Sequence, residues 1–134
     1  MSNVLKQYGP LVGRVLLAVM FLLAGINKIG GFAATSGWMA SKGLPMTDVL
    51  LVLTIIIEIG GAVMIMVGWK ASIGAAALLL FTIVASYVFH DFWNLTDTQA
   101  IQTQMIMLMK NLSIVGGLLI VMAFGTGPYS VEKS

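Results

Sequence analysis

Long apolar runs with few polar interruptions make up most of the chain. Four of them, roughly residues 8–27, 48–69, 71–90 and 98–124, could span a membrane as helices, because a hydrocarbon core of about 30 Å takes about 20 apolar residues. The apolar residues follow one another continuously, whereas the strands of a transmembrane β-barrel alternate in short segments. The pattern therefore predicts four transmembrane helices.

The segments between these runs complete the predicted fold. The connection from Asn27 to Thr47 is too long for a hairpin, so we expect a short interfacial helix over roughly residues 31–42, and Thr47 is expected to cap the next span. An even number of spans places both termini on one side, and the distribution of lysines favours the cytoplasmic side. The predicted class is all-α: a polytopic membrane protein whose residues 1–134 form a single domain, a four-transmembrane-helix bundle with a short interfacial helix between the first two spans.

Composition supports a membrane protein and narrows its chemistry. Of the 134 residues, 59% are hydrophobic and only 9% are charged, whereas a soluble domain carries about 25% charged residues. The net charge of +2 is small and dispersed, so nucleic acid is not expected as a partner. The chain has no cysteine and one histidine, His90, which excludes thiol redox chemistry, Cys-ligated metals and a bis-histidine haem within one chain. We expect no haem and no metal, and we interpret Trp38 as an interfacial anchor.

Three charged residues lie inside the apolar runs: Arg14 in the first, Glu58 in the second and Lys110 in the fourth. Ionisable residues at membrane depth are expensive and usually face the interior of a bundle, where they serve a function. Helical phase groups these residues with small or polar neighbours, namely Arg14 with Ala18, Phe21, Gly25 and Lys28, Glu58 with Thr54, Gly61 and Ala62, and Lys110 with Ser113 and Gly117. We expect Glu58 to point inward, toward Arg14 or Lys110.

The buried charges have two interpretations. Glu58 and one cation could form a structural ion pair that only fixes helix register. Against this, Arg14 and Lys110 are two deep cations for one deep anion, with Lys28 near them. An uncompensated cation favours a bound anion, or a ligand with strongly accepting oxygens such as a quinone. His90, at the end of the third span, is either an interfacial polar residue or a proton exchanger at the mouth of the site.

Three motifs resemble those of a known family. They are R-x6-F-x2-AG-x2-K from Arg14 to Lys28, E-x-GG from Glu58, and KN-x4-GG from Lys110. Over nearly its whole length the chain resembles the DoxX family of small four-span bacterial membrane proteins. The ending GPYS (residues 127–130) is similar to the family's GPG-x-x-S-x-D but is shifted and lacks one glycine. The resemblance implies a four-helix bundle in the bacterial inner (cytoplasmic) membrane, with cytoplasmic termini and an oxidoreductase role. The related DoxD group includes a subunit of a thiosulfate:quinone oxidoreductase.

Three functions are compatible with these residues. The first is a quinone-linked component of a membrane oxidoreductase, in which Arg14 or Lys110 bonds a quinone carbonyl, Glu58 exchanges a proton and Asn111 orients the ring. Lys28 and His90 complete this expected cofactor site. The second is a non-catalytic membrane anchor or assembly subunit for a soluble redox partner protein. The third is a small-solute or proton-coupled transporter, for which a homo-oligomer would supply more helices. Membrane lipid is an expected partner in every case.

Overall fold

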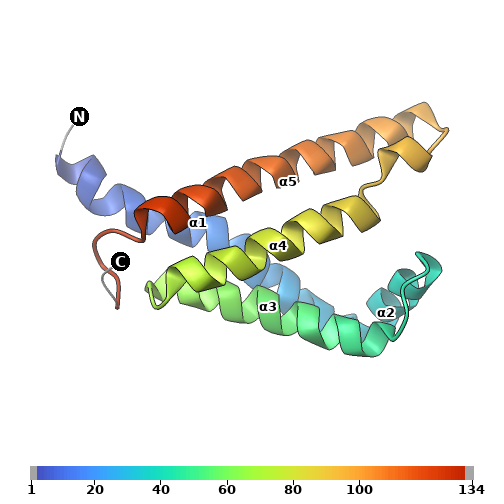
Figure 1. Cartoon of the computed structure of the whole chain (residues 1–134), viewed down its shortest axis with the longest axis horizontal. Helices are drawn as coiled ribbons and strands as arrows, with labels where there is room; N and C mark the ends of the chain where they lie inside the picture. The colour runs from blue at the N-terminus through green and yellow to red at the C-terminus, as the bar shows by residue number, and fades with distance from the viewer. Residues whose placement is uncertain (1–2, 132–134) are drawn as a thin grey trace.

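A computed structural model describes residues 3–131, and within that range the chain is almost entirely helical. Figure 1 shows the order of the elements, which are α1 (Asn3–Gly30), α2 (Phe32–Ser41), α3 (Thr47–Val67), α4 (Ala71–Phe89), the short 3-10 helix η1 (Phe92–Asn94) and α5 (Thr98–Phe124). The helix predicted over residues 31–42 is therefore present as α2.

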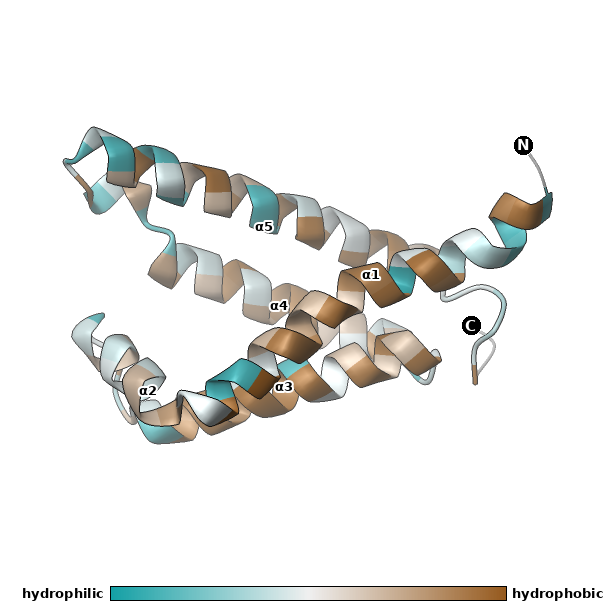
Figure 2. Ribbon diagram, turned by 180° about the vertical axis from the view of Figure 1, so that it is seen from behind, coloured by the Kyte–Doolittle hydropathy of each residue, from teal (hydrophilic) through white to brown (hydrophobic). Residues whose placement is uncertain are grey.

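Four of the described helices, α1, α3, α4 and α5, are long and apolar enough to cross a membrane. Their bounds agree with the predicted spans, except that α1 (Asn3–Gly30) is longer at both ends than the predicted 8–27. Hydrophobic residues predominate in these helices (Figure 2), and many large ones, such as Leu16, Ile56 and Leu80, are exposed, as contact with lipid requires. The prediction of an all-α polytopic membrane protein is confirmed.

The four long helices form two pairs that diverge. Helix α3 packs against both α1 and α4, whereas α5 packs mainly on α4 and meets α1 at few positions. The beginning of α1 and the segment after α5 lie at one end of the molecule, and α2 lies at the other (Figure 1). Toward the α2 end, the α1–α3 pair separates from the α4–α5 pair (Figures 1 and 2).

Glycines set the closest helix contacts. A Cβ atom at Gly25 of α1 would lie 2.6 Å from Ile59 Cγ1, and one at Gly61 of α3 would lie 2.8 Å from Leu78 Cγ and 3.2 Å from the Gly74 carbonyl oxygen. No Cβ fits at such distances, so these positions let α1 and α4 approach α3 closely. Small residues at helix interfaces are the usual means of close packing in membranes, where no water drives helices together.

The predicted inward faces agree with the observed burial in two helices. The buried residues of α1 are Arg14, Ala18, Phe21 and Gly25, which are the predicted stripe without Lys28. In α3, Glu58, Gly61 and Ala62 are buried, as predicted. The periodicity of small and polar residues was therefore sufficient to orient both helices. In α5 the predicted face is wrong, because Lys110 and Ser113 are exposed and the buried residues are Leu118 and Val121.

Helix α2 contacts both α3 and α4 at the end of the molecule where the two helix pairs diverge. Ser36 hydrogen-bonds to Thr47 Oγ1 at 2.8 Å and donates to Asp48 Oδ1 at 2.6 Å. Trp38 stacks on Phe89 of α4, with ring centroids 4.5 Å apart. The prediction that Thr47 caps α3 is wrong: Thr47 is the first residue inside the helix, and its hydroxyl bonds to Ser36 of α2 instead.

At the opposite end, Arg14 binds the backbone that follows α5. Its guanidinium donates to the carbonyl oxygens of Thr126 at 2.8 Å, Pro128 at 3.0 Å and Tyr129, and its Nε donates to the Met66 carbonyl at 3.3 Å. Arg14 is 3% exposed. The expected meeting of Arg14 with Glu58 is therefore wrong, because Arg14 lies near the carboxyl ends of α3 and α5 and its donors are taken by carbonyl groups.

This position stabilises a buried cation without a carboxylate. The last carbonyl groups of a helix have no partner within the helix and carry partial negative charge. Met66 belongs to the last turn of α3, and Thr126 follows the end of α5, so the planar guanidinium binds orphan acceptors from both regions. Segment 125–130 is thereby folded back onto α1, with Tyr129 stacked on Tyr8 at 5.5 Å.

Replacement of Arg14 by lysine tests this arrangement. Arg14→Lys keeps the charge but loses the fork that reaches several carbonyl groups. We expect the free energy of unfolding to fall by about 1–3 kcal/mol for the unsatisfied acceptors, measured by thermal melting in detergent. Chymotrypsin should also cleave after Tyr129 faster than in the wild type. The control is Lys6→Arg, an exposed exchange of the same two residue types. Wild-type melting and cleavage in Arg14→Lys would contradict this role.

Candidate functional site

A cavity of about 380 Å³ lies where the two helix pairs diverge. Residues from α1, α2, α3, α4 and α5 line it, so it depends on the whole fold rather than on one helix pair. Its volume is within the range of about 300–1,000 Å³ that is common for small-molecule sites. The cavity is therefore the candidate functional site.

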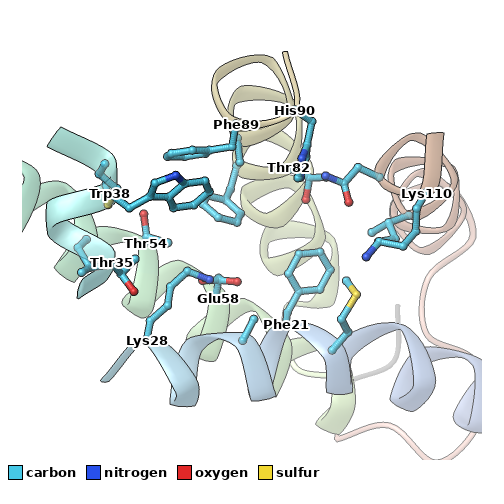
Figure 3. A pocket seen from close by; sticks show the side chains of 18 residues that line it. Phe21, Lys28, Thr35, Trp38, Thr54, Glu58, Thr82, Phe89, His90 and Lys110 are labelled. Atoms are coloured by element: carbon cyan, nitrogen blue, oxygen red, sulfur yellow. The ribbon is translucent and has the colours of Figure 1, made fainter. Parts of the chain in front are cut away.

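The walls of the cavity are mainly apolar and aromatic. Figure 3 shows Trp38 and Phe89 on one side and Phe21 on another. Further apolar residues that line it are Met20, Ala24, Met39, Leu51, Phe81, Ala85 and Ile114. Such walls accommodate a flat or apolar group and exclude water from the polar groups that point inward.

Lys28 and Glu58 form an ion pair at the cavity wall. Lys28 Nζ lies 2.8 Å from Glu58 Oε1, and the exposed fractions of the two side chains are 27% and 3%. The close contact of Gly25 with α3, one turn before Lys28, brings the ammonium to the depth of Glu58. Glu58 points inward as predicted, but the prediction that it faces Arg14 or Lys110 is wrong, because Lys28 is its partner.

Lys110 lines the cavity without a partner among residues 3–131. Its side chain points from α5 into the cavity (Figure 3), and no hydrogen bond or ion pair to it occurs within those residues. It is exposed rather than buried, because α5 packs mainly on α4 and α1 diverges from it. The described residues that line the cavity include two cations, Lys28 and Lys110, and one carboxylate, Glu58, so the cavity carries one excess positive charge.

Asn111 is oriented by a hydrogen-bonded chain on α4. Its Nδ2 donates to Ser86 Oγ at 3.0 Å, and Ser86 Oγ donates to the Thr82 carbonyl at 2.7 Å. Asn111 and Thr82 both line the cavity. The amide is thus held next to Lys110, where the two side chains can contact one ligand together.

His90 follows the last residue of α4 and lines the cavity. Its Nδ1 is 2.7 Å from Gln104 Oε1, a contact that joins α4 to α5. Five of the six residues that the sequence predicted for the site line this cavity, namely Lys28, Glu58, His90, Lys110 and Asn111, and Arg14 does not.

The sequence did not indicate the aromatic part of the site. Trp38, interpreted above as an interfacial anchor, lines the cavity and stacks on Phe89. Thr54 and Thr82 also line it. Thr54 lies one turn before Glu58 on the same face of α3, as the helical phase predicted. Trp38 enters the site only because α2 folds back toward α4, which no local pattern predicts.

The donors that line the cavity are ammonium, amide, hydroxyl, indole and imidazole groups. Within residues 3–131, no three His, Asp or Glu side chains gather as metal ligands would. A group that presents acceptor oxygens to Lys110 and Asn111 therefore matches the site best.

Comparison with known proteins identifies the family. The family model described as DoxX matches residues 9–91. The chain is 34% identical over 129 residues to the inner membrane protein YqjF of Escherichia coli, covering 96% of this chain and 93% of the relative. It is 28% identical over 123 residues to the inner membrane protein YphA of the same organism, covering 92% and 87%.

Part of a yeast protein is also similar to nearly the whole of this chain. The chain is 32% identical over 129 residues to the Surfeit locus protein 4 homolog of Schizosaccharomyces pombe, a match that covers 96% of this chain but 38% of that protein. No solved structure matches the chain significantly. The family match and the two bacterial relatives lead to one conclusion: the chain belongs to the DoxX family and is a multi-pass protein of the inner membrane.

Proposed function

We propose that the protein is a quinone-linked component of a membrane redox system and that its cavity binds the quinone ring. The observation that carries the proposal is the position of Lys110, which points into an aromatic cavity and has no partner among residues 3–131. Asn111 lies beside it, and the Lys28–Glu58 pair lies in the same cavity.

The character of the cavity supports a neutral, lipid-soluble ligand with acceptor oxygens. Aromatic side chains such as Phe21 and Phe89 suit the faces of a flat ring. The excess positive charge suits a ligand on which negative charge develops. The chain has no cysteine, so thiols cannot carry electrons, and a bound carrier or a partner protein must do so.

Each polar residue then has a role at the ring. A quinone supplies two-electron, two-proton chemistry when bound. Lys110 donates a hydrogen bond to a ring oxygen, and Asn111 fixes the orientation of the ring. Glu58 transfers a proton to or from an oxygen of the ring, while Lys28 keeps the carboxylate in place. His90 exchanges protons between the cavity and the aqueous side.

The Lys28–Glu58 contact also fits a structural ion pair, and a non-catalytic anchor subunit would need no more than that. The two cases differ in how the protein responds when both charges are removed together. A structural pair can be replaced by neutral residues with little loss, whereas a proton-transferring carboxylate cannot.

The first prediction concerns Lys110. Because it has no partner within residues 3–131, Lys110→Met breaks no ion pair there and should not lower the melting temperature. It should weaken binding of a decyl-substituted benzoquinone by about tenfold to hundredfold, the loss expected for one hydrogen bond to a charged donor. Quenching of tryptophan fluorescence measures this affinity, since Trp38 lines the cavity. Lys6→Met, outside the cavity, is the matched control. Equal affinity in wild type and Lys110→Met would remove the main support for the proposal.

The second prediction concerns the ion pair. Lys28→Met and Glu58→Gln should each lower the free energy of unfolding by about 1–3 kcal/mol, and the double variant should recover most of that loss. Glu58→Gln and the double variant should both reduce the bound benzoquinone about 10²- to 10⁴-fold more slowly than the wild type. A dissolved electron mediator drives this reaction, and ultraviolet absorbance follows it.

These measurements separate the two interpretations of Glu58. If the double variant is stable and reduces the ring at the wild-type rate, the pair is structural and the anchor function is favoured. If it is stable but slow, Glu58 acts in proton transfer. Lys28→Met alone is the control, because it leaves the charge of Glu58 without its partner but keeps the carboxyl group.

A further inference from the structure

A second cavity, of about 480 Å³, lies along the seam between α1 and α5. It is lined by Gly13 and Leu17 of α1 and by Gly117, Ile120 and Phe124 of α5. The first cavity lies farther along the same two helices, with Phe21 and Lys110 in its wall. At Gly117 a Cβ atom would lie 3.4 Å from Leu17 Cδ1, so a side chain larger than that of alanine would press on Leu17 here.

The two cavities differ in the charge that they offer. Arg14 lines the second cavity, but its guanidinium already donates to the carbonyl groups of Met66, Thr126 and Pro128. In the first cavity, Lys110 has no partner within residues 3–131. An amphiphile that occupied both would therefore place its polar head at Lys110 and its hydrocarbon at Arg14.

Gly13 leaves room in the second cavity. A Cβ atom at Gly13 would meet nothing within 4 Å, unlike one at Gly25 or Gly61. Glycine is less favourable than alanine inside a helix, and here it brings no other described helix closer. The space at Gly13 is thus available to something that lies against α1.

The path along α5 is too long for a ring alone. Lys110 and Phe124 lie on the same helix, and at 1.5 Å of rise per residue they are separated by about 20 Å along its axis. A ligand that reaches from the first cavity to the far end of the second needs an extended chain.

We propose that the second cavity is the subsite for the hydrocarbon chain of a long-tailed ligand whose ring lies in the first cavity. This inference rests on the proposed function and specifies its ligand class: a quinone with a long alkyl or isoprenoid chain, bound with that chain between α1 and α5. The hydrocarbon chain of the ligand takes the place of membrane lipid between α1 and α5. The cavity recognises this hydrocarbon by its shape rather than by polar contacts.

Photo-crosslinking tests this subsite. The probe is the decyl-substituted benzoquinone with a diazirine at the end of its chain, added to the full-length protein in lipid nanodiscs. Illumination followed by peptide mass spectrometry should place the label within residues 10–17 and 117–127. Gly13→Leu fills the cavity and should lower this labelling several-fold. Gly60→Leu is the matched control, because Gly60 is an exposed glycine inside α3 whose Cβ would also meet nothing within 4 Å.

A methyl-substituted benzoquinone, which has the ring without the chain, distinguishes the outcomes. It should displace the probe equally well from wild type and from Gly13→Leu, which shows that the ring site is intact. If it displaces the probe but the label falls on α2 or along the lipid-facing surface, the chain subsite is overturned while the proposed function stands. If the seam is labelled and the ring compound does not compete, the seam binds any membrane chain, and the inference is again overturned. If neither compound binds, the proposed function itself fails.

Discussion

The hydrogen bonds of Arg14 hold α1, the end of α3 and the segment after α5 together at one end of the molecule. In the hydrocarbon core of a membrane no water satisfies a guanidinium, so it must find acceptors inside the protein. Arg14 finds them at the end of α3 and in the segment after α5, and so joins both regions to α1. With its donors committed there, Arg14 takes no part in the first cavity, which lies where the two helix pairs diverge.

The diverging end has the opposite character. Its charges are not all neutralised within the described residues, because the 2.8 Å contact of Lys28 with Glu58 leaves Lys110 in excess. Helix α2 covers this end through the stacking of Trp38 on Phe89 and the contact of Lys42 with Asp91 at 3.4 Å. At one end of the molecule Arg14 and the backbone carbonyl groups satisfy each other. At the other end Lys110 has no partner among the described residues and is available to a ligand.

The three motifs that begin at Arg14, Glu58 and Lys110 serve both packing and the first cavity. In each of the three, a glycine lies close to another helix: Gly25 near α3, Gly61 near α4 and Gly117 near α1. The charged residues Lys28, Glu58 and Lys110 of the same motifs line the cavity. Because a lysine or glutamate reaches a neighbouring helix only when the backbones are close, the glycines and charges depend on each other.

The number of spans, the helix between the first two, and the inward faces of α1 and α3 could be predicted from the sequence, because apolar length and helical period are local properties of the chain. The sequence also identified five residues of the cavity, since charge inside an apolar run is visible without a structure. It could not identify the partner of Glu58. Arg14 and Lys28 share one stripe, and helical phase gives direction but not depth. The register of α1 against α3, fixed where Gly25 meets Ile59, places Lys28 beside Glu58 and Arg14 beside the end of α3. Trp38 and segment 125–130 were beyond prediction for the same physical reason: their contacts join segments far apart in the chain, and only the packed helices bring those segments together.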